Sequence, residues 1–178
     1  IATLGLLMTV FGGKDLGAAA ELMTVQNEDG VTEDVYVPKQ QYRQRLAVFF
    51  FDNKSGDPDL DWLQHGVGEL LTQDLQQNPF LSVASPFNWI NGYAARMRSE
   101  GFPDGLDVPR GLLREIASDA NRQYFVEGDI YRDGDNVRIT ARLWEADAMR
   151  QVAEISESGW DTLALMDDVS RQLREALQ

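Results

Sequence analysis

Cysteine is absent from this chain of 178 residues, and histidine occurs only once, at His65. Without a thiol the chain has no disulfide, no cysteine nucleophile and no thiolate metal site. A zinc site built on histidines would lack its second imidazole. We expect His65 to be a surface or sheet-facing residue of a helix. The lack of cysteine does not identify the cellular compartment, since it suits the periplasm as well as the cytoplasm.

Basic residues are few, because 16 Lys and Arg face 29 Asp and Glu, which gives a formal net charge of −13. Proteins that hold phosphate backbones present basic stripes, and no such stripe is visible in this sequence. The composition therefore argues against a nucleic-acid partner. It also disfavours docking of the folded part on anionic lipid headgroups.

Sequence motifs for phosphate, metal or acid–base chemistry are missing as well. Gly56, Gly66 and Gly68 lack the spacing of a dinucleotide fingerprint or a Walker A loop. An acidic trio at positions 57, 59 and 61 opens like a calcium loop, but Trp62 and Gly68 stand where that loop needs Gly and Glu. We therefore predict no catalytic residue, no metal site, no bound cofactor and no enzymatic activity.

The most informative stretch begins with six consecutive apolar residues, Leu46–Phe51, too short to span a membrane. Its branched and aromatic types predict a strand buried on both faces. A polar turn follows, in which Asp57 is the expected helix N-cap and Pro58 suits the first helical position. Apolar residues then recur at helical spacing as far as Leu75.

The remainder of the chain predicts an α/β fold with a mixed sheet of about five strands and about four helices. The run Phe80–Ala84 indicates a second strand, parallel to the first in a βαβ unit. Ser85-Pro86 predicts the start of a helix that contains Trp89 and Tyr93. Pro109 and Asp161 predict the starts of two further helices. Between them, an antiparallel meander of three strands is expected over 123–131, 137–144 and 150–156.

The first 45 residues indicate additions to that fold. Ile1–Gly13 is free of charge and resembles the trailing end of a membrane or signal segment, although an apolar segment packed on the domain is the alternative. We expect a linker over 14–21, a β-hairpin and connector over 22–45, and the α/β domain over 46–178. The hairpin turns at Asp29-Gly30. It either covers a sheet edge or pairs with another chain.

Two segments resemble the TolB-like amino-terminal domains found in larger bacterial proteins. One is the strand, Asn-x-Ser-Gly-Asp turn and helix of residues 46–75, and the other is the strand–Gly–hairpin run of 124–152. The resemblance covers about 45–177, in the same order. This chain departs from it at Phe49-Phe50-Phe51, where the family usually has Pro before the last Phe. The matching residues with structural roles are Phe51, Asn53, Ser55, Gly56, Asp57, Pro58, Gly66, Gly128 and Gly134.

The resemblance implies a noncatalytic domain for protein–protein interaction or assembly, tethered to a bacterial membrane and facing the periplasm, with the cytoplasm as the alternative. Such domains are often joined to kinases, cyclases or winged-helix regulators. The implied partners are other proteins or a second copy, and the membrane through the apolar start. A ligand-sensing domain with an apolar pocket beside the helix of Trp89 and Tyr93 is the second hypothesis. Candidate interaction residues are Val31, Val35, Tyr36, Val37, Trp89 and Tyr93.

Overall fold

A computed structural model describes residues 19–26, 29–87 and 92–178, which separate into two compact units at Arg43/Gln44. The predicted segment Ile1–Gly13, and residues 14–18 of the linker predicted over 14–21, lie outside the described residues. In the described part of the chain, no helix has both the length and the apolar character needed to cross a bilayer.

The first unit contains the predicted hairpin. Its strands, β1 (Ala20–Gln26) and β2 (Thr32–Pro38), pair antiparallel in a continuous register from Ala20 opposite Pro38 to Gln26 opposite Thr32. Arg43 follows a short 3-10 turn, η1 (Gln40–Tyr42), and its guanidinium forms an ion pair of 2.9 Å with Glu21.

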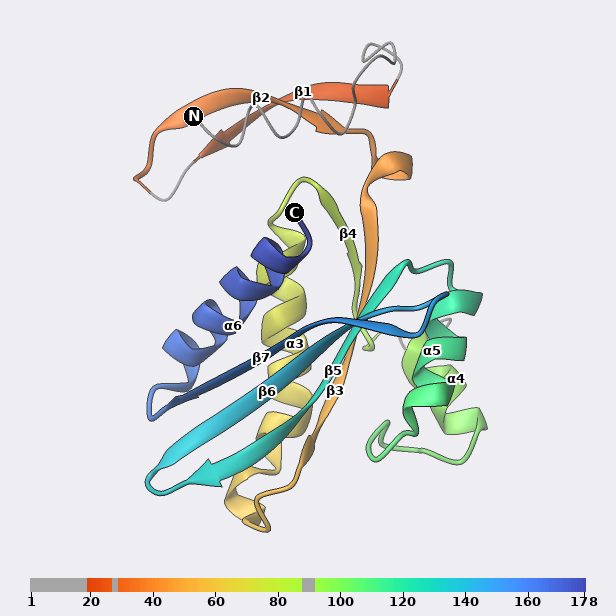
Figure 1. The fold of residues 1–178 in the computed structure, drawn as a ribbon, viewed down its shortest axis with the longest axis vertical. Helices are drawn as coiled ribbons and strands as arrows, with labels where there is room; N and C mark the ends of the chain where they lie inside the picture. Colours follow the sequence, from red (N-terminus) through yellow and green to blue (C-terminus); the bar gives the residue numbers. More distant parts are fainter. Residues whose placement is uncertain (1–18, 27–28, 88–91) are drawn as a thin grey trace. The chain divides into compact units, whose positions relative to one another are not determined.

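The second unit is a five-stranded mixed sheet in the order β4-β3-β5-β6-β7, as the sequence predicts (Figure 1). Strand β3 is parallel to both β4 and β5, and β5, β6 and β7 form the antiparallel meander. Helices α3 and α6 cover one face, and α4 and α5 cover the other face near β3 (Figure 1). The elements are β3 (Gln44–Asn53), η2 (Pro58–Leu60), α3 (Trp62–Gln76), β4 (Leu81–Ala84), α4 (Tyr93–Ser99), α5 (Arg110–Asp119), β5 (Tyr124–Asp133), β6 (Asn136–Glu145), β7 (Arg150–Gly159) and α6 (Thr162–Ala176).

The central strand β3 is buried on both faces, as its apolar run predicts. Leu46, Val48 and Phe51 join the core beneath α3 and α6, whereas Ala47, Phe49 and Phe50 join the core beneath α4 and α5. Simple alternation would place neighbouring residues on opposite faces. The register with β5 shifts between Val48 and Phe51, and both intervening phenylalanines therefore pack on the same side.

The Asn-x-Ser-Gly-Asp turn satisfies its own polar groups. Asn53 donates to the Asp57 carbonyl at 2.9 Å and to Asp61 at 2.7 Å, and its side-chain oxygen accepts from the Ser55 amide at 3.0 Å. Gly56 has φ +72°, a conformation that favours glycine. Asp57 caps the 3-10 turn that Pro58 opens, rather than α3 itself. Asp161 caps α6 as predicted.

One helix begins later than the sequence predicts. Ser85 and Pro86 lie in a turn, where the Ser85 hydroxyl accepts a hydrogen bond from the Phe87 amide at 3.1 Å. Helix α4 begins at Tyr93, behind Gly92. The predicted start at Ser85-Pro86 is therefore wrong, because the cap-like pair folds onto itself instead of opening a helix.

Gly128 tolerates no side chain. A Cβ there would lie 2.1 Å from the Thr140 carbonyl oxygen and 2.3 Å from the Phe51 ring, both held in the packed sheet. By contrast, a Cβ at Gly111, on the exposed side of α5, would meet nothing within 4 Å.

We therefore expect Gly128→Ala to lower the free energy of unfolding by about 3 kcal/mol or more, because neither neighbour can move without disturbing the sheet. The control Gly111→Ala should raise it by about 0.5 kcal/mol through helix propensity. Urea unfolding of both variants measures the difference. Equal stability of the two would contradict the close packing at Gly128.

Candidate functional site

The second unit contains a charged pocket on the face covered by α4 and α5. Its volume is about 190 Å³. Three carboxylates line it, from Asp52, Glu127 and Asp129, together with the guanidinium groups of Arg110 and Arg142. Phe50, Val108 and Leu113 supply an apolar wall.

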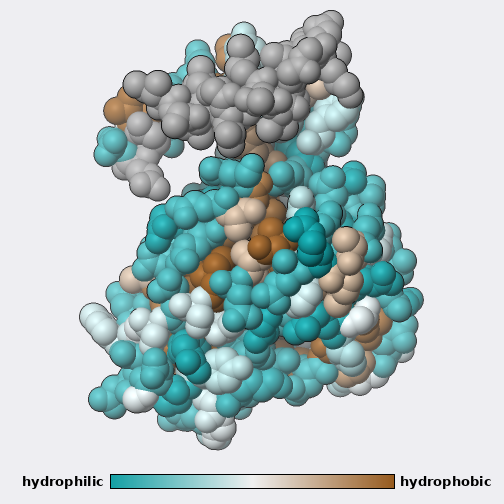
Figure 2. Space-filling view, in the orientation of Figure 1, coloured by the Kyte–Doolittle hydropathy of each residue, from teal (hydrophilic) through white to brown (hydrophobic). Residues whose placement is uncertain are grey.

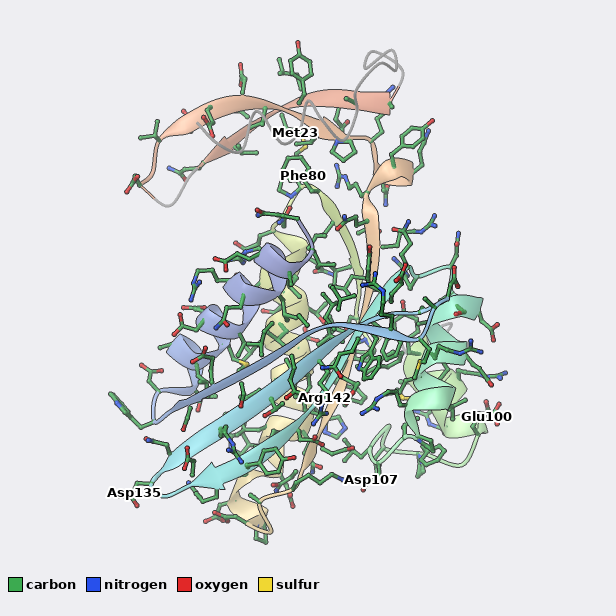
Figure 3. All side chains as sticks on the ribbon, viewed as in Figure 1. Met23, Phe80, Glu100, Asp107, Asp135 and Arg142 are labelled. Atoms are coloured by element: carbon green, nitrogen blue, oxygen red, sulfur yellow. The ribbon has the colours of Figure 1, made fainter. Side chains whose placement is uncertain are left out.

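The topology explains why these charges meet. Helices α4 and α5 cover β3 and the start of β5, so the outer face of the meander is left without a helix (Figure 1). The pocket lies at the margin of that cover, beside the carboxyl end of β3. Figure 3 shows Arg142 on this face of the sheet, toward the loop that contains Asp107.

Arg142 is the centre of the charge network. Its guanidinium donates to Glu127 at 3.2 Å, to Asp129 at 2.5 Å and to Glu154 at 3.3 Å, thereby linking β5, β6 and β7. Only 16% of its side chain is exposed. Burial acts to lower the pKa of Arg142, but the hydrogen bond to Asp129 and the three negative charges together raise it above the ordinary value. Carboxylates of both neighbouring strands, β5 and β7, thus neutralise the charge of Arg142.

Glu127 is held from three directions. Its carboxylate accepts from Arg110 at 3.1 Å, from Arg142 at 3.2 Å and from the Trp144 indole at 3.0 Å. The Arg110 guanidinium also lies over the Trp144 ring, 4.4 Å from its centroid. Both oxygens of Glu127 therefore have partners.

The negative charge of Asp52 is less well compensated by nearby cations than that of Glu127. Its Oδ1 accepts from the Asp107 amide at 2.7 Å, whereas the nearest cation, Lys54, is 3.8 Å from Oδ2 and makes its shorter contact, 2.7 Å, with Asp107. Burial raises the pKa of Asp52 most, and the negative charges of Asp107 and Asp129 raise it further against the opposing effects of the Asp107 amide and Lys54.

The loop before α5 forms one side of the pocket and is tied to the sheet and to α3. Asp107 adopts a left-handed backbone (φ 53°) while it contacts Asp52 and Lys54. His65 makes a hydrogen bond of 2.9 Å between Nε2 and the Asp104 carbonyl, and its ring packs on Phe50 with centroids 4.5 Å apart. The single histidine is thus half-buried and positions the loop.

No cluster of three or more His, Cys, Asp or Glu side chains suited to a metal ion occurs within 19–26, 29–87 and 92–178. The carboxylates of the pocket are instead interleaved with arginines.

The candidate interaction residues are divided among different environments. Val31 and Tyr36 are exposed by 59% and 61%, Val35 is half-buried and Val37 is buried. Tyr93 is only 6% exposed and packs on Phe49 with ring centroids 5.3 Å apart, so it serves the core. Trp89 lies outside the described residues.

The pocket also differs in kind and place from the apolar one expected beside the helix of Trp89 and Tyr93. It is charged, and α5 and the loop before it line it, with no residue of α4. No local sequence pattern indicates this pocket, because its charged residues come from separate strands and one helix start. Gly66 and Gly134 lie outside the pocket, in α3 and in the β5–β6 turn.

Comparisons with known proteins agree with the resemblance seen in the sequence. No family model matches the chain. It is 25% identical over 143 residues to putative adenylate cyclase 3 of Rhizobium meliloti, a match that covers 79% of this chain and 22% of that protein. The chain therefore spans about a fifth of the curated relative's length.

Solved structures share the fold. The LpoB C-terminal domain from Salmonella enterica matches with a TM-score of 0.54 and 14% identity, over 66% of this chain and 83% of that chain. Lipoprotein GNA1162 from Neisseria meningitidis matches with a TM-score of 0.54 and 16% identity, over 75% of this chain and 99% of that chain. TolB from Acinetobacter baumannii matches with a TM-score of 0.51 and 12% identity, over 90% of this chain and 31% of that chain. The chain has the TolB-like fold, and none of these three structures is named as an enzyme.

The charge network makes a prediction about stability. Arg142→Leu should lower the free energy of unfolding by about 3 kcal/mol, because it leaves Glu127 and Asp129 buried without their shared cation. Glu154→Gln removes a carboxylate that is 52% exposed and should cost less than about 0.5 kcal/mol. Denaturant unfolding at pH 7 compares the two, and a smaller loss for Arg142→Leu than for Glu154→Gln would contradict the assignment of Arg142 as the centre.

Asp52 makes a prediction about pH. Its pKa is higher in the folded chain than in the unfolded chain, so the folded state binds the proton more tightly and loses stability as pH rises through this range. Asp52→Asn keeps an acceptor for the Asp107 amide but carries no charge. It should therefore be more stable than wild type at pH 7, and the difference should shrink toward zero as pH falls below 3.8, the ordinary pKa of an aspartate. Unfolding curves at several pH values check this, and a variant less stable than wild type at pH 7 would refute it.

Proposed function

We propose that the chain is a noncatalytic protein-interaction or assembly domain of a larger bacterial envelope or signalling protein. In this proposal the apolar start at Ile1–Gly13 belongs to a membrane tether and the folded part faces the periplasm. The fold shared with TolB, the LpoB domain and a lipoprotein supports an envelope role. The partners are other proteins or a second copy of the chain.

The observation that supports the interaction role most is the surface of the hairpin. Leu22 and Tyr36 are direct cross-strand partners in β1 and β2, and both are exposed, by 56% and 61%. A two-stranded hairpin is marginally stable in water by itself, so covering such an apolar pair would stabilise it. Strand β2 also contains Glu33 and Asp34, which favour a partner with basic groups around an apolar centre.

The remaining surface gives less reason to expect a broad apolar interface. On the face shown in Figure 2, hydrophilic residues cover most of the second unit, and hydrophobic residues gather in limited patches. Among the described residues of the second unit, the exposed large hydrophobic side chains are those of Trp62, Trp160 and Leu163. The hairpin is therefore the better candidate for recognition of a protein partner.

Ligand sensing coupled to a separate effector is the second candidate function. The charged pocket favours it, because buried charges that are only partly compensated often mark functional sites. The similarity to part of a putative adenylate cyclase also suits a domain that acts beside an effector.

Photo-cross-linking in the native host tests the interaction role. A photoreactive phenylalanine analogue at Tyr36 should give a discrete adduct with one protein or with a second copy, identified by mass spectrometry. The same analogue at Leu163, which is 64% exposed in α6, is the matched control and should give none. The proposal fails if position 36 gives no adduct, or only the products formed at position 163.

A further inference from the structure

We propose that the charged pocket binds a small organic cation, an alkylguanidinium or alkylammonium group, with its charge between Asp52 and Asp129 and its chain on the apolar wall. The inference rests on the second of the two proposed functions, ligand sensing, and supplies the chemical class of the ligand. It is independent of the contacts proposed for the hairpin.

The two carboxylates are neighbours by register. Asp52 of β3 and Asp129 of β5 are paired positions in adjacent parallel strands, and both line the pocket. Like charges at opposed positions in a sheet destabilise it. The fold thus brings together two negative charges at a cost, which a cation bound between them would offset.

The protein's own cations do not fully supply that compensation. Arg142 contacts only Oδ2 of Asp129, and no described residue donates a hydrogen bond to Oδ1 of that side chain. Lys54 lies 3.8 Å from Asp52 Oδ2 and is engaged with Asp107. One oxygen of each aspartate is therefore left to accept a charge-assisted hydrogen bond.

An anion fits this pocket poorly. Arg110 and Arg142 already donate to carboxylates of the network, and three acidic side chains line the pocket against these two basic ones. A cleft lined by an excess of one charge attracts the opposite charge. We therefore expect the ligand to carry a positive charge.

The size and the apolar wall narrow the class further. A volume of about 190 Å³ is below the ordinary range of drug-sized ligand sites, so a nucleotide is too large. Phe50, Val108 and Leu113 provide a surface for a short aliphatic chain. A guanidinium or ammonium group on such a chain is found in free amines and in the side chains of arginine and lysine, and the chemistry is the same for both.

The test uses amide NMR spectra of the purified chain titrated with butylguanidinium, and with butyrate as the anion of similar chain length. Butylguanidinium should give saturable shifts centred on Gly105, Asp107 and Gly128, and butyrate should not. Asp52→Asn should weaken binding by about tenfold, because one of the two charged acceptors is lost. Glu154→Gln, which removes a network carboxylate outside the pocket lining, should change it by less than about twofold.

A variant expected to bind more tightly distinguishes an effect on binding from an effect on folding, because damage to the fold would weaken binding. Lys54→Met removes the cation that competes for Asp52, so it should tighten binding by about threefold at low salt. Unchanged or weaker binding in this variant would overturn the placement of the ligand charge at Asp52. The capped tripeptide acetyl-Gly-Arg-Gly-amide distinguishes the sources: binding as tight as that of butylguanidinium assigns the cation to a partner's side chain, and exclusion of the peptide assigns it to a free small molecule.

The remaining outcomes separate this inference from the proposed functions. Shifts at the pocket with butyrate alone would overturn the cationic class and leave ligand sensing in place. The absence of shifts with either probe would overturn both the inference and ligand sensing. Neither result bears on the interaction role, which depends on cross-links from Tyr36.

Discussion

The central strand β3 must be covered on both faces, and the rest of the second unit follows from that constraint. Its six apolar residues are all buried, and each one left in water would cost about 1 to 3 kcal/mol, depending on its size. Helices α3 and α6 cover one face over the length of the sheet, whereas α4 and α5 are shorter and cover only part of the other. The uncovered part of that face must be polar, and the arginine–carboxylate network occupies it.

Most of the fold could be predicted because it depends on local patterns. The apolar run of β3, the turn that follows it and the Asp161 cap each specify structure through near neighbours in sequence. The late start of α4 was missed because the Ser85 hydroxyl accepts a hydrogen bond from the Phe87 amide within a turn, which a cap pattern in the sequence does not distinguish from a helix start. The shift that puts Phe49 and Phe50 on one side depends on pairing with β5, which is distant in sequence. That shift falls where this chain departs from the proline usual in the TolB-like domains that its sequence resembles, and it places Phe50 in the pocket wall.

The pocket could not be predicted for a related reason. Asp52, Arg110 and Arg142 each resemble a solvated surface charge when considered in sequence, and only the strand order brings them together. The exposed hairpin was easier to foresee, because alternation and the Asp-Gly turn are local signals. The two proposed functions would thus belong to separate units, since the hairpin would bind a protein and the pocket would bind a small cation. A signal between these two units would not require a binding site that both of them form.

The two edge strands of the five-stranded sheet limit pairing with other molecules in different ways. Both β4 and β7 leave one side of their backbone without a partner strand in the described chain, which invites uncontrolled pairing with another molecule. Strand β4 has only four residues and offers few free amides. Strand β7 has ten, but it includes Arg150, Glu154 and Glu157, whose charges resist fibre-like stacking. Long-term solubility of this unit therefore depends on side chains at one border and on shortness at the other.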